Sequence, residues 1–256
     1  MNNLEGQTAV VTGSSSGIGR AIALQLAQAG AHVLIHARAQ RTAAESVAGQ
    51  VRGLGRMSEV FLADLADPKQ RVELVERAWH WRQGVQVWVN NAGADVLTGP
   101  AASWTFEEKL ARLWSVDVVG TIQLSKMVGQ RMREQGDGVL LNMGWDQAEQ
   151  GMAGDSGEMF GAVKGAIMAF SRSLAQSLAP HVRVNCLAPG WIQTAWGETA
   201  SDAWQQRARR ESLRNRWGTP EDVARVACFL ASSDAAFLNG QVVAINGGFR
   251  YGAPLA

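Results

Sequence analysis

A glycine-rich segment near the N-terminus has the residue types that hold a phosphate group. Residues 12–19 read TGSSSGIG and lie between a β-rich run and a helical run. Gly13, Gly17 and Gly19 allow the backbone to turn tightly and to approach a pyrophosphate without Cβ clashes. The helix N-terminus that follows offers free N–H groups and a partial positive charge. A plain strand-to-helix turn is the alternative, but the strand–loop–helix context favours a dinucleotide phosphate site.

Basic residues follow the second β-rich run. It ends in His36-Ala37-Arg38, with Arg41 close behind, and no acidic residue occurs from Gly6 to Ala44. An NAD site usually places Asp or Glu here to bind the ribose 2′-hydroxyl, whereas Arg pairs with a 2′-phosphate and stacks on adenine. We therefore predict NADP(H) as the cofactor. The alternative is that Arg38 is a solvated loop charge.

These residues must be positioned by an alternation of short β-rich runs and longer helical runs. The expected strands are Thr8–Thr12, His32–Ala37, Met57–Leu62, Val85–Asn90, Gly138–Met143, Val182–Leu187 and Gln241–Ile245. The expected helices lie near Ile18–Ala29, Arg41–Gly53, Pro68–Gln83, Thr105–Gln135, Glu158–Leu178 and Pro220–Ala231. This order predicts an α/β fold with a doubly wound, mostly parallel sheet and helices on both faces. Without a linker or repeat, residues 1–256 are expected to form one domain, with a mobile lid around 191–217.

The composition limits the class of protein. A net charge of +1 gives no general attraction to nucleic acid or to an anionic membrane, and the apolar runs are too short to span a bilayer. The N-terminus lacks a secretory signal pattern. Cys186 and Cys228 lie in apolar runs, as buried thiols do in a reducing cytoplasm, so we expect a cytoplasmic protein. Four scattered histidines without a Cys-His cluster predict no metal site.

Six motifs in order resemble the short-chain dehydrogenase/reductase family. They are TGSSSGIG, NNAG at 90–93, FGAVK at 160–164 in the place of the family's YxxxK, Pro189-Gly190 with Thr194, RWGTPEDVA at 216–224 and NGG at 246–248. The resemblance runs from about Leu4 to Phe249. It implies the family's seven-stranded Rossmann-type sheet and oxidoreductase activity on a carbonyl or alcohol substrate.

The resemblance also implies which residues contact the cofactor. The loop would bind it through Thr12, Gly13, Ser15, Ser16, Gly17, Ile18 and Gly19, and Arg38 would face the 2′-phosphate. Asp64 and Leu65 would lie at the adenine, and Asn91, Ala92 and Gly93 at the central ribose. The remaining implied contacts, around the nicotinamide and its ribose, are Lys164, Pro189, Gly190, Ile192 and Thr194. Two of these features have plain structural alternatives, since Asn91 can satisfy buried backbone and Pro-Gly can form an ordinary turn.

The catalytic pattern of the family is broken in this chain. Family members use a Tyr general acid, a Lys four residues later, a Ser after the fifth strand and an Asn in the long helix before it. Here Lys164 is retained, but Phe160, Trp145 and Asp117 occupy the Tyr, Ser and Asn positions. The loop before Phe160 is about two residues longer than usual, which leaves the Trp145 alignment open. Losing a positioned general acid costs about 10²–10⁴ in rate.

Other groups are candidates for the missing acid. Asp146 follows the serine position, and a carboxyl can transfer protons if desolvation raises its pKa. Asp155 and Glu158 are expected to be solvated. Tyr251, the only tyrosine, is a weak candidate from a neighbouring subunit and better explained as a rim aromatic. Lys164 can equally serve only to bind the nicotinamide ribose.

The substrate and the assembly state are indicated only in outline. Trp145, Trp191 and Trp196 suggest a pocket for an apolar small molecule, although the rings can also fill that pocket. Five lid arginines, from Arg207 to Arg216, suit either an anionic substrate or a solvated helix, and the solvated helix is favoured. The helix Phe160–Leu178 is apolar nearly all round, which predicts a homodimer or homotetramer.

Three functions remain open from the sequence. The first is an NADP(H)-dependent oxidoreductase with altered proton chemistry, which the resemblance favours. The second is an inactive NADP(H)-binding sensor or a partner subunit of an active relative. The third is a lyase or isomerase that uses Asp117 or Asp146 without redox chemistry, because fold does not fix function.

Overall fold

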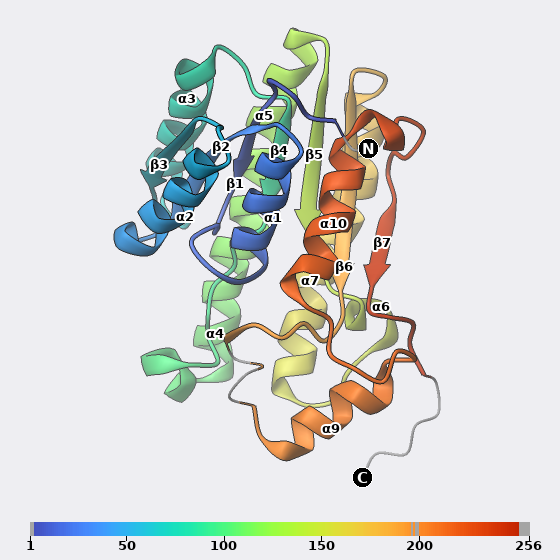
Figure 1. Cartoon of the computed structure of the whole chain (residues 1–256). Helices are drawn as coiled ribbons and strands as arrows, with labels where there is room; N and C mark the ends of the chain where they lie inside the picture. The colour runs from blue at the N-terminus through green and yellow to red at the C-terminus, as the bar shows by residue number, and fades with distance from the viewer. Residues whose placement is uncertain (1–2, 196, 198–199, 251–256) are drawn as a thin grey trace.

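The centre of the molecule is a parallel sheet of seven strands (Figure 1). The strands are β1 (Thr8–Val11), β2 (His32–Ala37), β3 (Ser58–Leu62), β4 (Val87–Asn90), β5 (Gly138–Met143), β6 (Val182–Pro189) and β7 (Val242–Ile245). They lie in the order β3-β2-β1-β4-β5-β6-β7. This computed structural model describes residues 3–195, 197 and 200–250. The order is that of a doubly wound Rossmann-type sheet and confirms the predicted fold class.

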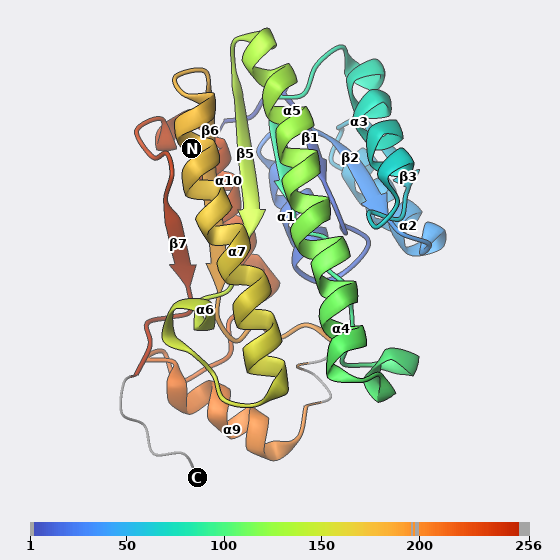
Figure 2. The ribbon, with the colours of Figure 1, turned by 180° about the vertical axis from the view of Figure 1, so that it is seen from behind.

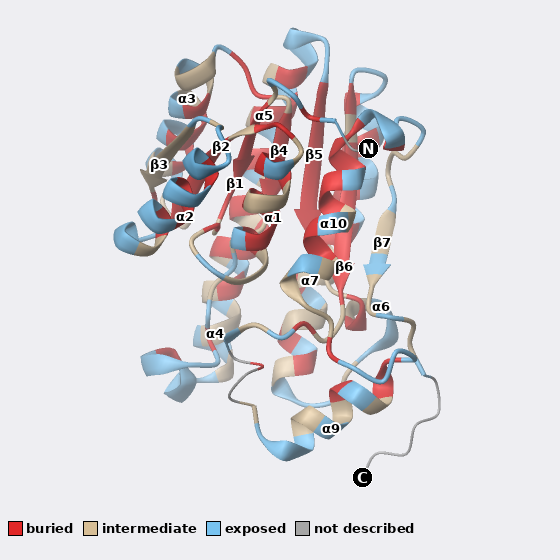
Figure 3. Ribbon diagram, viewed as in Figure 1, coloured by how far each residue is buried: buried red, intermediate tan, exposed pale blue. Residues whose placement is uncertain are grey.

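Helices cover both faces of the sheet. One face carries α1 (Gly17–Gln28), α2 (Arg41–Gly53) and α10 (Pro220–Ala231); the other carries α3 (Pro68–Arg82), α5 (Thr121–Gln135) and α7 (Asp155–Leu178) (Figure 2). Ala9 and Val11 pack with the first set and Val10 with the second, because successive strand side chains point to opposite faces. The buried residues therefore concentrate in the strands and on the inner sides of the helices (Figure 3).

The strand order reverses between β1 and β4, where doubly wound sheets bind their ligands. The chain segments that leave these two strands are joined by Thr12. Its Oγ1 accepts hydrogen bonds of 3.0 Å from the backbone N–H groups of both Asn91 and Ala92. The glycine-rich loop and the NNAG segment are thereby fixed side by side at the carboxyl end of the sheet.

The long helix expected at 105–135 contains a change of helical type. It consists of α4 (Phe106–Leu113), the π-helical segment η2 (Trp114–Gly120) and α5. A π-helix closes its hydrogen bonds over five residues and changes which side chains face inward. A sequence pattern with a period of 3.6 residues cannot reveal this change of helical type. Asp117 lies in the π-helical segment, with only 2% of its surface exposed. The short elements η1 (Gly99–Ser103), α6 (Gln147–Gln150) and η3 (Ser233–Ala235) were also not expected.

The helix α9 (Asp202–Glu211) lies beyond the carboxyl ends of the strands (Figure 1). The segment after β7 anchors the end of this helix, because Leu213 N donates to Gly248 O at 3.0 Å and Arg250 N donates to Glu211 O at 2.8 Å. Among the described residues, no helix is long and apolar enough to cross a bilayer.

Candidate active site

The glycine-rich loop has the conformation that its glycines predict. Gly13 and Gly17 have φ angles of +63° and +54°, in the left-handed region that L-residues with a side chain rarely adopt. At Gly19 a Cβ would lie 2.3 Å from Gly13 O and 2.4 Å from Asn91 Nδ2. Asn91 Nδ2 in turn donates to Thr12 O and Gly13 O at 2.9 and 3.1 Å. Asn91 thus satisfies backbone groups of the loop, which is the structural role considered above. It also lines the cavity described next.

A cavity of about 440 Å³ lies over the loop and the ends of β2 and β3. Of the predicted cofactor residues, it is lined by Gly13, Ser15, Ser16, Arg38, Asp64, Leu65, Asn91, Ala92 and Gly93. His36 and Arg112 line this cavity as well, although neither is among the predicted cofactor-binding residues. Thr12 and Gly19 lie beneath this lining and support it.

His36 connects the glycine-rich loop to the third strand. Its Nδ1 accepts from Gly13 N at 3.0 Å, and its Nε2 lies 3.0 Å from Ala63 O. These two partners require Nε2 to carry the proton of a neutral ring. Burial lowers the pKa of His36 to about 4, which agrees with that neutral state.

Arg112 reaches across the same cavity to Asp64, with Nη2 3.3 Å from Oδ2. Burial opposes ionisation of Asp64, but the hydrogen bond from Ala66 N and the charges of Arg112 and Arg38 outweigh it and lower the pKa of this carboxyl. The positive charges of Arg38 and Arg112 therefore act on one cavity wall. Arg112 is 48 residues from Asp64 in the chain, so only the folded chain shows the pair.

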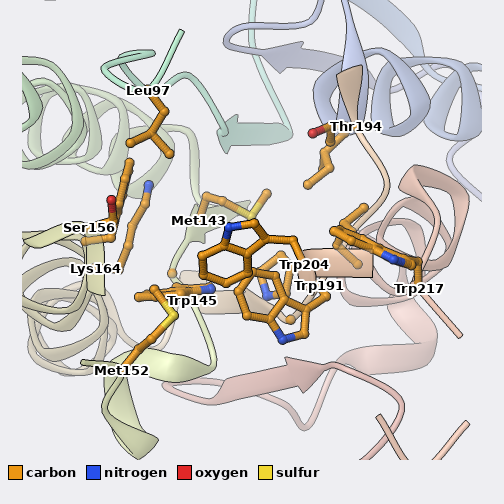
Figure 4. A pocket seen from close by; sticks show the side chains of 16 residues that line it. Leu97, Met143, Trp145, Met152, Ser156, Lys164, Trp191, Thr194, Trp204 and Trp217 are labelled. Atoms are coloured by element: carbon orange, nitrogen blue, oxygen red, sulfur yellow. The ribbon is translucent and has the colours of Figure 1, made fainter. Parts of the chain in front are cut away.

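A second cavity of about 380 Å³ lies between α7 and the segment after β6. Among its lining residues are the predicted Ile18, Lys164, Pro189, Gly190, Ile192 and Thr194. Aromatic rings supply much of the remaining wall, from Trp145, Phe160, Trp191, Trp204 and Trp217. Figure 4 shows Lys164 and Ser156 on the opposite side of this cavity from Trp217. Among the described residues that line this cavity, Lys164 is the one with an ionisable side chain.

A third cavity adjoins both of the others. It is lined by Gly17 and shares Ser16 and Asp95 with the first cavity and Leu97 and Thr194 with the second. The three cavities follow one another along the carboxyl edge of the sheet. We call them together the trough. It places the predicted adenine-end residues at one end and the predicted nicotinamide-end residues at the other.

Lys164 and Asp117 form a largely buried ion pair at the second cavity. Lys164 Nζ lies 2.9 Å from Asp117 Oδ2, with 13% and 2% of the two side chains exposed. Asp117 Oδ1 accepts from Ala94 N at 2.8 Å, so both carboxylate oxygens have a partner. Gly93 is needed beside them, because a Cβ there would lie 2.9 Å from Asp117 Oδ2. The structure thus brings two of the three predicted catalytic residues together.

Phe160 and Trp145 occupy the cavity wall next to this pair. Their ring centroids are 6.3 Å apart in an edge-to-face arrangement, which is a favourable geometry for aromatic rings. The hydroxyl-bearing lining residues are Ser156, one helical turn before Phe160, and Thr194. Ser156 is only four residues before Phe160 in the chain, and α7 places both on the cavity.

Asp146, the third catalytic candidate, is not a partner in this ion pair. It is absent from the lining of the second cavity, and its Oδ2 accepts from Asn246 Nδ2 at 2.9 Å instead. Burial raises the pKa of Asp146 to about 6, and the hydrogen bond from Asn246 only partly opposes this. The raised pKa that would suit an acid is present, but Asp146 is not among the described residues that line the second cavity.

The predicted lid contains an internally paired cluster. Arg207 Nε donates to Glu211 Oε1 at 2.7 Å, and the Arg207 guanidinium lies over the ring of Trp191. Arg216 pairs with Asp222 at 2.7 Å. These pairings favour the structural explanation for two of the lid arginines. Trp196 and Tyr251 lie outside the described residues. No cluster of three or more metal-ligating His, Cys, Asp or Glu side chains occurs within the described ranges.

A doubly wound parallel sheet with a glycine-rich loop at its switch point defines a Rossmann-type dinucleotide-binding protein. A family model described as Enoyl-(Acyl carrier protein) reductase matches residues 13–250. Mouse dehydrogenase/reductase SDR family member 4 is 33% identical, over 96% of this chain and 88% of its own length. The chain therefore belongs to the short-chain dehydrogenase/reductase family of oxidoreductases.

Solved structures agree with this assignment. A putative NAD(P)-dependent gluconate 5-dehydrogenase from Beutenbergia cavernae, with bound NADP, is 35% identical with a TM-score of 0.86, covering 96% of this chain and 97% of its own. A 7α-hydroxysteroid dehydrogenase complexed with NADH and 7-oxo glycochenodeoxycholic acid is 28% identical with a TM-score of 0.87, covering 97% and 96%. Both NADP-bound and NADH-bound proteins are thus similar in fold to this chain.

Proposed function

We propose that this chain is an NADP(H)-dependent oxidoreductase that interconverts a carbonyl and an alcohol in an apolar small molecule, with proton transfer altered at Phe160. The observation that carries the proposal is the trough, which joins a glycine-lined polar cavity to an apolar cavity lined by the ammonium group of Lys164. A dinucleotide bound along it would be held at the loop, at Arg38 and at Lys164. The nicotinamide would supply or accept a hydride at the apolar end.

Three observations support NADP(H) over NAD(H). Arg38 lines the first cavity, and no acidic residue follows β2 to bind a ribose 2′-hydroxyl. Arg112 adds a second guanidinium to the same wall. The nearest carboxylate, Asp64, is already paired with Arg112, which limits its repulsion of a 2′-phosphate.

The test of the cofactor assignment is an Arg38→Asp variant. We expect its NADPH affinity to fall by about 10- to 100-fold, because a charge-assisted hydrogen bond of roughly 1.5–3 kcal/mol is lost. Arg41→Asp is the matched control, since Arg41 lies outside the cavity lining and pairs with Glu45. Affinities are measured by quenching of tryptophan fluorescence. Equal affinity of the parent for NADH and NADPH would contradict the assignment.

The test of the activity is NADPH oxidation across ketones, aldehydes and quinones, with parent and Phe160→Tyr enzymes side by side. We expect slow turnover of apolar carbonyl compounds by the parent and only a small gain from the new phenol. An inert parent with an active variant would instead identify a reductase site that has lost its activity. Saturating NADPH binding, checked separately, shows that the site is intact in both enzymes.

The second candidate function is an inactive NADP(H)-binding sensor or partner subunit. The observation that favours it is the aromatic pair Trp145 and Phe160, which replaces hydroxyl groups on the cavity wall beside Lys164. Tight NADPH binding without turnover, together with co-purification of an active relative, is its expected signature. A lyase or isomerase is less well supported, because Asp146 is not among the described lining residues and Asp117 is paired with Lys164. Substrate conversion without change in NADPH would be its signature.

A further inference from the structure

The apolar cavity offers few groups that can move a proton. Its lining residues include two hydroxyls, on Ser156 and Thr194, and one ionisable side chain, Lys164. An aliphatic hydroxyl is a much weaker acid than an ammonium group. Lys164 is therefore the strongest Brønsted acid among the lining residues that the structure describes.

The nearby acids outside the lining are held elsewhere. Asp146 is hydrogen-bonded to Asn246 and is not part of the cavity wall. Cys186 is fully buried behind Gly144, where a Cβ would lie 2.9 Å from its Sγ. Burial raises the pKa of the Cys186 thiol to about 12. Neither group can reach a substrate in the cavity without a rearrangement of the wall.

We propose that the Lys164 ammonium, held by Asp117, is itself the proton donor to the substrate oxygen. This inference rests on the proposed carbonyl reduction. An ammonium group carries three N–H donors, and within the described chain Lys164 uses one of them on Asp117. Two donors remain for ligands, enough for one ribose hydroxyl and one substrate oxygen. Phe160 carries no hydroxyl group that could relay the proton from Lys164 to the substrate.

The step consumes one proton from the solvent. A bound reduced nicotinamide would supply a hydride to the carbonyl carbon, and the π electrons of the C=O bond would move to the oxygen. That oxygen would form a bond to a proton of Lys164 Nζ, while the N–H electrons remain on nitrogen as a neutral amine. The amine would then take up one proton (H⁺) from the solvent. The balance is carbonyl, reduced nicotinamide and H⁺ to alcohol and oxidised nicotinamide, with the ammonium group restored.

Asp117 acts as the positioning residue for this donor. Its carboxylate is 2% exposed and is fixed by Ala94 N on one oxygen and Lys164 Nζ on the other. The buried carboxylate thereby fixes the position of the ammonium group at the cavity wall. The π-helical segment η2 contains Asp117, so a change in helix type accompanies the placement of this charge.

The first experiment removes the donor and then restores it chemically. We expect Lys164→Ala to lower turnover at saturating NADPH by about 10²–10⁴-fold, and added methylammonium to restore part of it in a concentration-dependent way. Tetramethylammonium has the charge but no N–H proton, and is expected to restore nothing. Turnover by Lys164→Ala within about threefold of the parent, or equal rescue by both cations, would overturn the inference.

The second experiment separates proton donation from cofactor binding. Lys164→Arg keeps the positive charge and N–H donors, but a guanidinium does not release a proton in proteins. We expect it to bind NADPH, by tryptophan fluorescence, more nearly like the parent than Lys164→Ala does, while its turnover stays low. Asp117→Asn is expected to bind NADPH like the parent but to lower turnover at saturating NADPH by about 10-fold or more. Unchanged turnover, or a loss of turnover matched by a loss of NADPH binding, would overturn the role of Asp117.

Different results would overturn the proposed carbonyl reduction and the proton-donor role of Lys164. A parent that binds NADPH but reduces no carbonyl compound in the panel overturns the proposed function. A parent that turns over, with Lys164→Ala or Lys164→Arg equally active, overturns the proton-donor role alone.

Discussion

Phe160 has a phenyl ring, which carries no proton to transfer. Trp145 packs edge-on against this ring. The two rings make this part of the second cavity wall apolar, and Lys164 lines the same cavity. At the scale of residues, the candidate site is distinguished by a lysine that is paired with the buried carboxylate of Asp117 beside an aromatic wall.

His36 makes the stability of the cofactor end depend on pH. Its folded-state pKa is lowered from 6.5 to about 4, so below pH 6.5 the unfolded chain takes up a proton that the folded chain does not. The contribution of neutral His36 to the free energy of unfolding is therefore fully present above pH 6.5. It falls by roughly 3 kcal/mol as the pH decreases toward 4. Urea midpoints at pH 7.5 and 5 measure the loss. We expect a smaller loss in His36→Gln, and an equal loss in both proteins would refute this role.

Asp146 has the opposite dependence. Its pKa is raised from 3.8 to about 6, so the folded chain holds a proton that the unfolded chain releases between these values. The resulting stability is lost as pH rises through this window. Asp146→Asn cannot ionise and can still accept from Asn246. We expect it to be more stable than the parent at pH 8, by up to about 3 kcal/mol, with the gain disappearing near pH 4. Asp155→Asn, at an exposed carboxylate, is expected to show no such gain.

At the scale of elements, the site depends on close contacts between loops that follow different strands. The loop after β1 is held against the segment after β4 by Thr12 and Asn91. The chain after β6 forms a wall of the second cavity, and Gly190 leaves room there for Asn246. Because these loops position one another, a small change in one is transmitted to the cofactor site.

Gly19→Ala tests the contact between α1 and these loops. The new Cβ would overlap Gly13 O and Asn91 Nδ2, and both belong to rigid backbone or hydrogen-bonded groups. We expect NADPH affinity to fall at least about 10-fold and stability to fall by about 1–3 kcal/mol. Gly49→Ala, on an exposed position of α2, is the control. It is expected to gain about 0.5–1 kcal/mol in stability with unchanged affinity, and parallel behaviour of the two variants would contradict the argument.

At the scale of the whole molecule, the sheet ends at β7, whose outer edge has no partner strand within the described chain. Phe237 is fully exposed at 103%, and Phe229 on α10 is 38% exposed. The apolar residues of α7 that suggested an interface, such as Val163 and Leu174, are buried within the chain itself. If subunits associate, the exposed phenylalanines are therefore a better guide to the surface involved than α7.

We still expect a homodimer or homotetramer, now with Phe237 in its interface. Burial of one phenylalanine contributes about 1.5–3 kcal/mol, so Phe237→Ser is expected to weaken association about 10- to 100-fold. Light scattering across micromolar concentrations measures the change. Leu54→Ser, at another exposed apolar residue, serves as the control and should associate like the parent. A monomeric parent would refute the prediction.

The sequence by itself determined the features that depend on local chain geometry. Alternating β-rich and helical runs predicted the doubly wound sheet, since side-chain periodicity is set by backbone form. Glycines at 13 and 17 predicted a tight loop because few other residues adopt positive φ. The four-residue spacing of Phe160 and Lys164 on one helix placed both on the same cavity wall.

Only the tertiary structure decided which distant groups meet. Asp146 accepts a hydrogen bond from Asn246, 100 residues away, and is not among the described residues that line the second cavity. Arg112 on α4 reaches Asp64, 48 residues away in the chain, and no local pattern encodes that approach. Asp117 faces Lys164 within a π-helical segment that regular periodicity does not predict. Such contacts depend on how elements pack and where side chains point, and these are properties of the whole fold.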